Sequence, residues 1–128
     1  MSKYKILDLG CGNKKRDGTI GVDFNERTKA DIIHDLNEFP YPFESQSIDK
    51  IYIDNTLEHL ESPLSVMEEL FRITKKKGLV KVIVPYFRSP SAFIDPTHTK
   101  FFTVESFHTM IQTMLFVNDM TIHLRGLR

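Results

Sequence analysis

The chain has 128 residues, 41% of them hydrophobic, and its 17 basic residues balance its 17 acidic ones. This length and composition suit one globular domain, residues 1–128, with a hydrophobic core. Zero net charge gives no global attraction to nucleic acid or membrane, and no apolar run is long enough to span a bilayer. The single cysteine, Cys11, excludes an internal disulfide and a cysteine-cluster zinc site. The start of the chain lacks an apolar signal segment, so we expect a cytoplasmic protein.

The first predicted strand leads into a loop that contains two glycines. Residues 4–9 form a short apolar strand, and Gly10 and Gly12 follow it on either side of Cys11. Two glycines one residue apart let the backbone turn sharply and leave bare main chain for a ligand to approach. Their N–H groups could also hold an anionic group such as a carboxylate or phosphate. We therefore expect the anionic or polar end of a ligand over this loop.

The second predicted strand, residues 19–24, ends in a carboxylate. Asp23, followed by Phe24, would lie at the carboxyl end of a strand next to the first one. A carboxylate in this position suits the two hydroxyl groups of a ribose. The two strand ends together predict one ligand that spans the glycine loop and Asp23.

The remaining elements follow from apolar periodicity and helix end signals. A helix is predicted over 62–77, because Ser62 can cap it, Pro63 suits its first turn and Gly78 can close it. Its last turn would hold the lysines at 75–77, which is favourable with the helix dipole. The other predicted elements are strands over 30–36, 48–54, 79–86 and 120–124, a long loop over 87–102 and a second helix over about 103–115.

The first two crossovers are unusually short for a parallel sheet. The polar loop 13–18 leaves no room for a helix, and only residues 25–29 separate the second strand from the third. Parallel neighbours usually need a connection of a dozen or more residues. We predict a mostly parallel sheet and keep an antiparallel or frayed third strand as the alternative.

The order of motifs resembles that of class I S-adenosylmethionine-dependent methyltransferases. Their first motif, acidic-x-Gly-x-Gly, is matched by Asp8 to Gly12, and roughly the first ninety residues follow the family in order. Further matching segments are 31–36, 43–51, 57–60, 70–78 and 82–85. The resemblance implies an α/β, Rossmann-like, three-layer fold with S-adenosylmethionine as cofactor. The usual antiparallel seventh strand is missing, so the chain is a minimal or a truncated version.

Candidate cofactor residues lie where the predicted strands end. Ligands of open α/β sheets bind at the carboxyl ends of the strands, at the switch point between the first and the fourth. That rule selects the loop after residue 85 and Gly10, Cys11, Gly12, Asp23, Phe24, Asp35, Leu36 and Asn55.

The resemblance assigns a role to several of these positions. It implies that Asp8 supports the glycine loop at the methionine end and that Asp23 binds the ribose. It implies further that Asp35 and Leu36 lie at the adenine, and that Asn55 and Thr56 contact the methionine part. The alternative for Asp23 and Asp35 is a turn or helix-cap carboxylate, but almost no helix follows either strand.

A dinucleotide site is the competing interpretation of the glycine loop. The loop lacks the third glycine that permits close helix–strand packing in dinucleotide-binding folds. The predicted elements also include no helix whose N-terminus could take a pyrophosphate. We therefore favour S-adenosylmethionine.

Two places offer a general base for methyl transfer to a hydroxyl group. His59 follows the fourth strand, and Asp95 and His98 lie in the long loop where an acceptor should enter. Packing or loop stabilisation is the alternative role for both histidines. A metal site built from these three residues is conceivable by ligand chemistry, but no recognised ligand spacing supports it.

The predicted function is methyl transfer to a small-molecule or glycan-type acceptor, with no nucleic-acid or membrane partner. The alternative is a non-catalytic protein of the same fold that binds the cofactor or a partner. We also expect a homodimer through the sheet edge, because the fifth strand would be apolar and exposed without a seventh. The alternative is a monomer whose tail pairs directly with the fifth strand.

Overall fold

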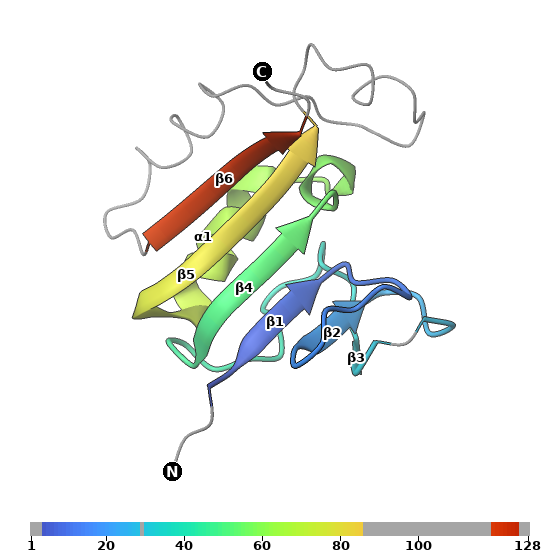
Figure 1. Cartoon of the computed structure of the whole chain (residues 1–128), viewed down its shortest axis with the longest axis horizontal. Coiled ribbons are helices and arrows are strands. Elements are labelled where there is room, and N and C mark those ends of the chain that lie inside the picture. Colours follow the sequence, from blue (N-terminus) through green and yellow to red (C-terminus); the bar gives the residue numbers. More distant parts are fainter. Residues whose placement is uncertain (1–3, 29, 86–118, 126–128) are drawn as a thin grey trace.

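Six strands form a single sheet in the order β3-β2-β1-β4-β5-β6, and every neighbouring pair is parallel. The structure, a computed structural model, describes residues 4–28, 30–85 and 119–125 (Figure 1). The strands are β1 (Ile6–Leu9), β2 (Ile20–Asp23), β3 (Ile32–Ile33), β4 (Ile48–Asp54), β5 (Thr74–Pro85) and β6 (Asp119–Arg125). The predicted Rossmann-like α/β fold is confirmed. The parallel pairing of β3 makes the antiparallel alternative for the third strand wrong, whereas its length of two residues agrees with the frayed alternative.

The core lies between this sheet and α1 (Pro63–Ile73). Alternate residues of β4 and β5 are buried, as expected for strands with one face against a helix. They join one cluster with Val66, Met67, Leu70 and Ile73 of α1. A short 3-10 helix, η1 (Leu57–His59), lies between the end of β4 and the start of α1 (Figure 1).

The start of α1 is as predicted, but its end is not. Ser62 caps the helix by accepting a hydrogen bond from the Ser65 N–H, and Pro63 occupies the first turn. The helix stops at Ile73, because Thr74 is extended and pairs with Ile48 as the first residue of β5. Thr74 is β-branched, which suits a strand, and its hydroxyl donates to the Leu70 carbonyl oxygen.

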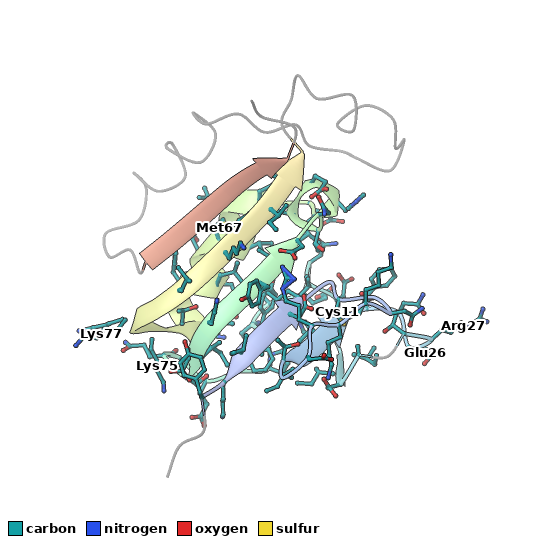
Figure 2. All side chains as sticks on the ribbon, in the orientation of Figure 1. Cys11, Glu26, Arg27, Met67, Lys75 and Lys77 are labelled. Carbon is teal, nitrogen blue, oxygen red and sulfur yellow. The ribbon has the colours of Figure 1, made fainter. Side chains whose placement is uncertain are left out.

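The three lysines predicted at the helix end therefore belong to β5. Lys75 forms an ion pair with Asp49, with Nζ and Oδ1 3.1 Å apart. Lys77 projects from the molecule near the start of the strand (Figure 2). Gly78 does not close a helix; a Cβ there would lie 2.4 Å from a methyl carbon of Thr74. Long-range strand pairing overrides the local helix signals here.

Besides β5, which begins five residues before the predicted start, the largest difference in strand length is at the sheet edge, in β3. The strand over 48–54 is confirmed, whereas β3 has two residues in place of the predicted 30–36. Before β3, Asp31 Oδ2 accepts a hydrogen bond from the Gly21 N–H at 2.8 Å. A side chain thus takes a backbone donor of β2, and the ladder is confined to two pairs.

One α-helix is described, and it covers one face of the sheet (Figure 1). The connections from β1 to β2 and from β2 to β3 contain no helix, as the short crossovers predicted. The opposite face carries polar side chains on central strands. Lys50 Nζ and Lys81 Nζ lie 4.7 and 5.9 Å from the centre of the Tyr52 ring. Within the described ranges, no helix is long and apolar enough to cross a membrane.

The tail forms β6, which pairs directly with β5 from Leu79↔Asp119 to Pro85↔Arg125. The predicted tail strand is confirmed and is slightly longer than 120–124. Because β6 pairs with β5 within the same chain, the outer edge of β5 is covered. The prediction that this edge is exposed, on which the dimer prediction rested, is therefore wrong. The predicted loop 87–102 and helix 103–115, with Asp95 and His98, lie outside the described residues.

Candidate functional site

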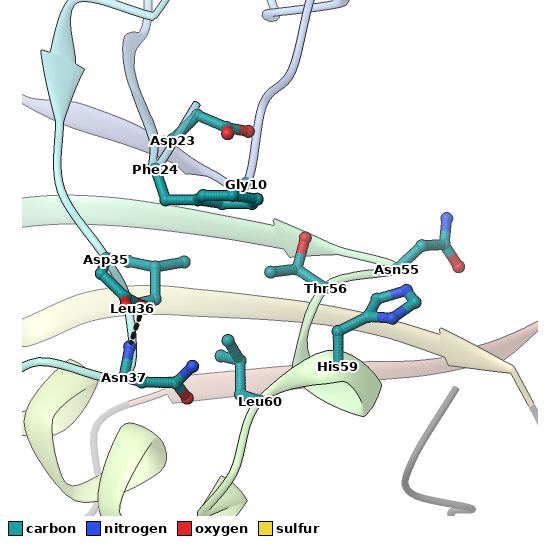
Figure 3. Close-up of a pocket in the computed structure, with 10 residues that line it drawn as sticks. All are labelled: Gly10, Asp23, Phe24, Asp35, Leu36, Asn37, Asn55, Thr56, His59 and Leu60. Atoms are coloured by element: carbon teal, nitrogen blue, oxygen red, sulfur yellow. Dashed lines mark hydrogen bonds between the residues drawn. The ribbon is translucent and has the colours of Figure 1, made fainter. Parts of the chain in front are cut away.

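A pocket of about 580 Å³ opens at the carboxyl ends of β1, β2 and β4. Figure 3 shows Asp23 and Phe24 on one side of it and His59 and Leu60 on the other. Its lining consists of Gly10, Asp23, Phe24, Asp35, Leu36, Asn37, Asn55, Thr56, His59 and Leu60. The fold brings these residues together because parallel strands end at one edge of the sheet, as the sequence predicted for all of them except Asn37 and Leu60.

The glycine loop does not offer its N–H groups to a ligand. The N–H groups of Gly10 and Cys11 both donate to the Val22 carbonyl oxygen, at 2.7 and 3.3 Å. The Gly12 N–H donates to Asp23 Oδ2 at 2.9 Å. The expectation that these groups hold an anion is therefore wrong, because the short loop uses them to join β1 to β2. Gly10 contributes bare main chain to the pocket.

Asp23 serves two purposes at the end of β2. Its Oδ2 accepts from Gly12, and its Oδ1 accepts from the Asn25 N–H at 3.0 Å. A carboxylate has about four acceptor positions, so two backbone donors leave it able to accept from a ligand hydroxyl. Asp23 is buried yet lines the pocket. Asp23 thus stabilises a turn, which was the alternative role considered for it, and also lines the pocket where a ribose contact was expected.

Asp35 and Leu36 form the wall beside β3. Asp35 Oδ1 accepts from the Asn37 N–H at 2.9 Å, the bond dashed in Figure 3, so this carboxylate also holds a turn. The buried Tyr41 hydroxyl donates to the Leu36 carbonyl oxygen at 2.8 Å. Asn37, which sequence reasoning missed, accepts from the Glu61 N–H at 2.9 Å and ties this wall to the segment after η1. Its position directly after Asp35-Leu36 was the available signal.

Asn55 has an unusual backbone conformation at the end of β4. Its φ of 51° is in the left-handed region, where a non-glycine residue is uncommon. Its N–H donates to the Ile83 carbonyl oxygen at 2.7 Å, which holds it against β5. Its side-chain Oδ1 is buried and has no hydrogen-bond partner in the described part of the chain. Asn55 is also one of the residues that line the pocket.

Thr56 closes the gap between the β1 and β4 ends. A Cβ added at Gly10 would lie 2.2 Å from Thr56 Oγ1, so the Thr56 side chain takes the space that a larger residue at 10 would need. The Thr56 hydroxyl donates to the Asp54 carbonyl oxygen at 3.0 Å. The close approach of these two strand ends explains why residue 10 of this chain has to be a glycine.

Three predicted residues lie away from the pocket lining. Gly12 joins β1 to β2, and Asp8 is buried and accepts from the Arg16 N–H at 2.9 Å. Burial raises the pKa of Asp8, and its contacts with Arg16 partly oppose that shift. Cys11 is buried, and burial raises the pKa of its thiol, so it is a packed small residue and not a nucleophile.

Of the candidate bases, His59 lines the pocket from η1. Asp95 and His98 lie outside the described residues. Within the described ranges, no group of three or more His, Cys, Asp or Glu side chains could hold a metal ion.

The polar lining carries two carboxylates, those of Asp23 and Asp35. No Lys or Arg belongs to the lining found in the described ranges. Such a site suits a ligand with hydroxyl, amino or cationic groups and disfavours a pyrophosphate. Leu36, Leu60 and Phe24 supply an apolar surface for a flat ring.

Residues 7–82 match the family model described as a methyltransferase domain. Among solved structures, the chain is similar to a SAM-dependent methyltransferase from Archaeoglobus fulgidus, with a TM-score of 0.72 and 24% identity over 86% of this chain and 59% of that one. No curated protein matches the sequence.

Two further structures have the same fold. One is a SAM-dependent methyltransferase from Thermotoga maritima, described as a possible histamine N-methyltransferase, with a TM-score of 0.69 and 18% identity over 88% of this chain and 64% of that one. The other is a chain from a complex between the Haloferax volcanii Trm112 methyltransferase activator and a protein described as a methyltransferase. It has a TM-score of 0.69 and 15% identity over 86% of this chain and 60% of that one. The chain thus spans about three fifths of the length of these structures.

Proposed function

This chain belongs to the family of methyltransferase domains, and we propose that it binds S-adenosylmethionine in the pocket and transfers the methyl group to a small-molecule or glycan-type acceptor. The observation that carries the proposal is the position of Asp23. Its carboxylate ends β2, is oriented by two backbone N–H groups and lines the pocket beside Gly10. A carboxylate fixed in this way can accept hydrogen bonds from both hydroxyls of a ribose.

The rest of the lining fits the other parts of the cofactor. Asp35 can accept from the exocyclic amine of adenine, and Leu36 can pack against the ring. Asn55 and Thr56, which line the pocket at the end of β4, would contact the methionine part. Asp8 stabilises the loop after β1 by accepting a hydrogen bond from the Arg16 N–H, and in this proposal it does not contact the ligand.

When bound, the cofactor supplies an electrophilic methyl group on a sulfonium sulfur. The residues of this chain would then align the acceptor with that methyl and exclude water. A base of this chain would take the proton of the acceptor hydroxyl or amine as that group is methylated. His59 lines the pocket and is one candidate base. His98, assisted by Asp95, is the other, and it stays part of the proposal.

Calorimetry tests the cofactor assignment directly. S-adenosylmethionine and S-adenosylhomocysteine at millimolar concentration should each give a saturable heat with the wild-type chain, whereas NAD should give none. The two carboxylates of the lining are the reason, because they can serve a ribose and an amine, and the lining of the described ranges holds no Lys or Arg for a pyrophosphate. Saturable heat from NAD alone would overturn the assignment.

The acceptor is proposed to be a small molecule or glycan. A turnover screen over small amines, phenols and sugars, with release of S-adenosylhomocysteine as the readout, would identify it. Once an acceptor is known, His98→Ala should lower kcat by about 10²–10⁴-fold while cofactor affinity is retained, if His98 is the base.

A non-catalytic protein of the same fold is the second candidate function. The observation that favours it is that one of the structural relatives comes from a complex with a methyltransferase activator. Saturable cofactor binding without turnover on any acceptor, both alone and with added partner proteins, would support this candidate over the enzyme.

Self-association and a cytoplasmic location are further parts of the proposal. Since β6 pairs with β5, a homodimer would use the outer edge of β6, where the described sheet ends. Strand edges carry backbone groups that can pair with another chain. Light scattering at micromolar protein concentration tests this, and a monomer mass would reject it. Fractionation of cells that express the chain checks its location.

A further inference from the structure

Arg16 lies in the loop between β1 and β2 and contacts four other residues. Its backbone N–H donates to Asp8 Oδ2 at 2.9 Å, and its carbonyl oxygen accepts from the Thr19 hydroxyl at 2.6 Å. Its guanidinium group forms an ion pair with Asp54 and lies over the Tyr52 ring, with Cζ 4.1 Å from the ring centre. One residue thus joins the loop to β1 and to β4.

These contacts connect the two sides of the pocket. Asp8 lies two residues before Gly10, and Asp54 directly precedes Asn55 and Thr56. The Thr56 hydroxyl donates to the Asp54 carbonyl oxygen, so a shift of Asp54 would move a pocket residue. Arg16 and Asp54 do not themselves line the pocket. Any effect they have on a ligand must therefore act through the residues that they hold.

The loop 10–19 needs such a side-chain support because it contains no helix. A helix after β1 would hold this connection against the sheet by packing an apolar face, and none is present between β1 and β2. The planar guanidinium group can combine ion pairing with stacking on an aromatic ring, which a lysine cannot reproduce. Arg16 does both on the face of the sheet that α1 leaves uncovered.

We propose that Arg16, through its pairing with Asp54, is a positioning residue that holds the glycine loop and the β4 end at the spacing required for cofactor binding. The effect on affinity rests on the proposed function, whereas the mechanical link between the two loops does not. Both consequences can be measured separately.

The affinity test compares Arg16→Met with Lys15→Met. Lys15 is the matched control, because it is the adjacent cation of the same loop and pairs with Asp31, away from the pocket. Arg16→Met should weaken S-adenosylhomocysteine binding about tenfold, as expected for coupled contacting residues, while Lys15→Met stays within about twofold. Calorimetry is done well below the unfolding midpoint of each ligand-free variant. A purely structural role would lower that midpoint and leave the affinity of the folded chain unchanged.

A double-mutant cycle tests the route through Asp54. Asp54→Asn should weaken binding to a similar degree, and the double variant should bind no worse than Arg16→Met alone, because both remove the same link. Equal affinities of Arg16→Met and Lys15→Met would overturn the proposal. Full additivity of Arg16→Met and Asp54→Asn would also overturn it.

Hydrogen exchange in the ligand-free chain separates this inference from the proposed function. Arg16→Met should accelerate exchange of the Gly12 and Asn55 amides together, and Lys15→Met should not. If the wild-type chain fails to bind S-adenosylhomocysteine, the proposed function fails and exchange still decides the link. Unchanged exchange at both amides in Arg16→Met would refute the link itself.

Discussion

The Gly12 N–H donates a hydrogen bond of 2.9 Å to the Asp23 carboxylate. This bond joins the glycine loop after β1 to the end of β2, so the two motifs act as one unit. The loop supplies the donor that orients the carboxylate, and the carboxylate in turn stabilises a loop that has no helix behind it.

Replacement of Asp23 tests the ribose contact. Asp23→Ala should weaken S-adenosylhomocysteine binding by at least about 1.5–3 kcal/mol, the usual range for a hydrogen bond to a charged group. Asp23→Asn should lose less, since its amide oxygen can still accept from one backbone donor. Asp17→Asn removes an exposed carboxylate of the neighbouring loop and serves as the control. Calorimetry that finds Asp23→Ala equal to Asp17→Asn would exclude Asp23 from the site.

Alanine at the two glycines of the loop should have different effects. Both glycines have positive φ, 70° at Gly10 and 54° at Gly12, so alanine strains the backbone by about 1–2 kcal/mol at each. A Cβ at Gly10 also collides with Thr56, whereas nothing lies within 4 Å of a Cβ at Gly12. Gly10→Ala should therefore destabilise the chain more and remove most cofactor binding. Thermal unfolding and calorimetry compare the two, and equal losses would contradict the close Gly10–Thr56 contact.

Glu69 should make stability depend on pH. Burial alone would raise the pKa of Glu69, but hydrogen bonds from Arg72 and the Tyr41 N–H outweigh burial and lower it. A carboxyl with a lowered folded-state pKa stabilises the fold above its unfolded-state pKa, and this stabilisation is lost as pH falls through the folded-state value. Glu69→Gln should thus cost about 1–3 kcal/mol at pH 7 and progressively less below the ordinary glutamate pKa of 4.5.

The control for this prediction is Glu68→Gln, an exposed neighbour on the same helix. Thermal unfolding between pH 7 and pH 3 should show a pH-dependent difference for Glu69→Gln and almost none for Glu68→Gln. A difference for Glu69→Gln that stays constant with pH would mean that its charge contributes nothing.

Gly78 provides a test of where α1 ends. Within β5, a Cβ at this position would lie 2.4 Å from a Thr74 methyl carbon and 2.9 Å from the Asp49 carbonyl oxygen. Gly78→Ala should therefore cost about 1–3 kcal/mol, as overpacking does. Gly18→Ala is the comparison, since its φ of 77° is strained but its surroundings are open. A neutral Gly78→Ala in thermal unfolding would contradict the pairing of this segment with β4.

The sequence by itself was sufficient to predict the succession of strands along the chain, the start of α1 and most of the residues that line the pocket. Apolar runs mark strands locally, and the Ser62–Pro63 cap is a contact between near neighbours in the chain. Asp23, Asp35 and Asn55 were selected because strand ends in a parallel sheet share one edge. That rule depends on the order of elements and not on atomic positions, so a sequence can support it.

Only the tertiary structure decided the features that depend on distant partners. Pairing with Ile48 makes Thr74 a strand residue, against the helix signals of its neighbours. The Val22 carbonyl oxygen takes the N–H groups of Gly10 and Cys11, which the motif alone left available to an anion. The contact of Arg16 with Asp54 joins residues 38 positions apart. In each case a local preference competes with a bond to a residue far away in the sequence. The distant bond prevails because polar groups buried in the sheet need a partner.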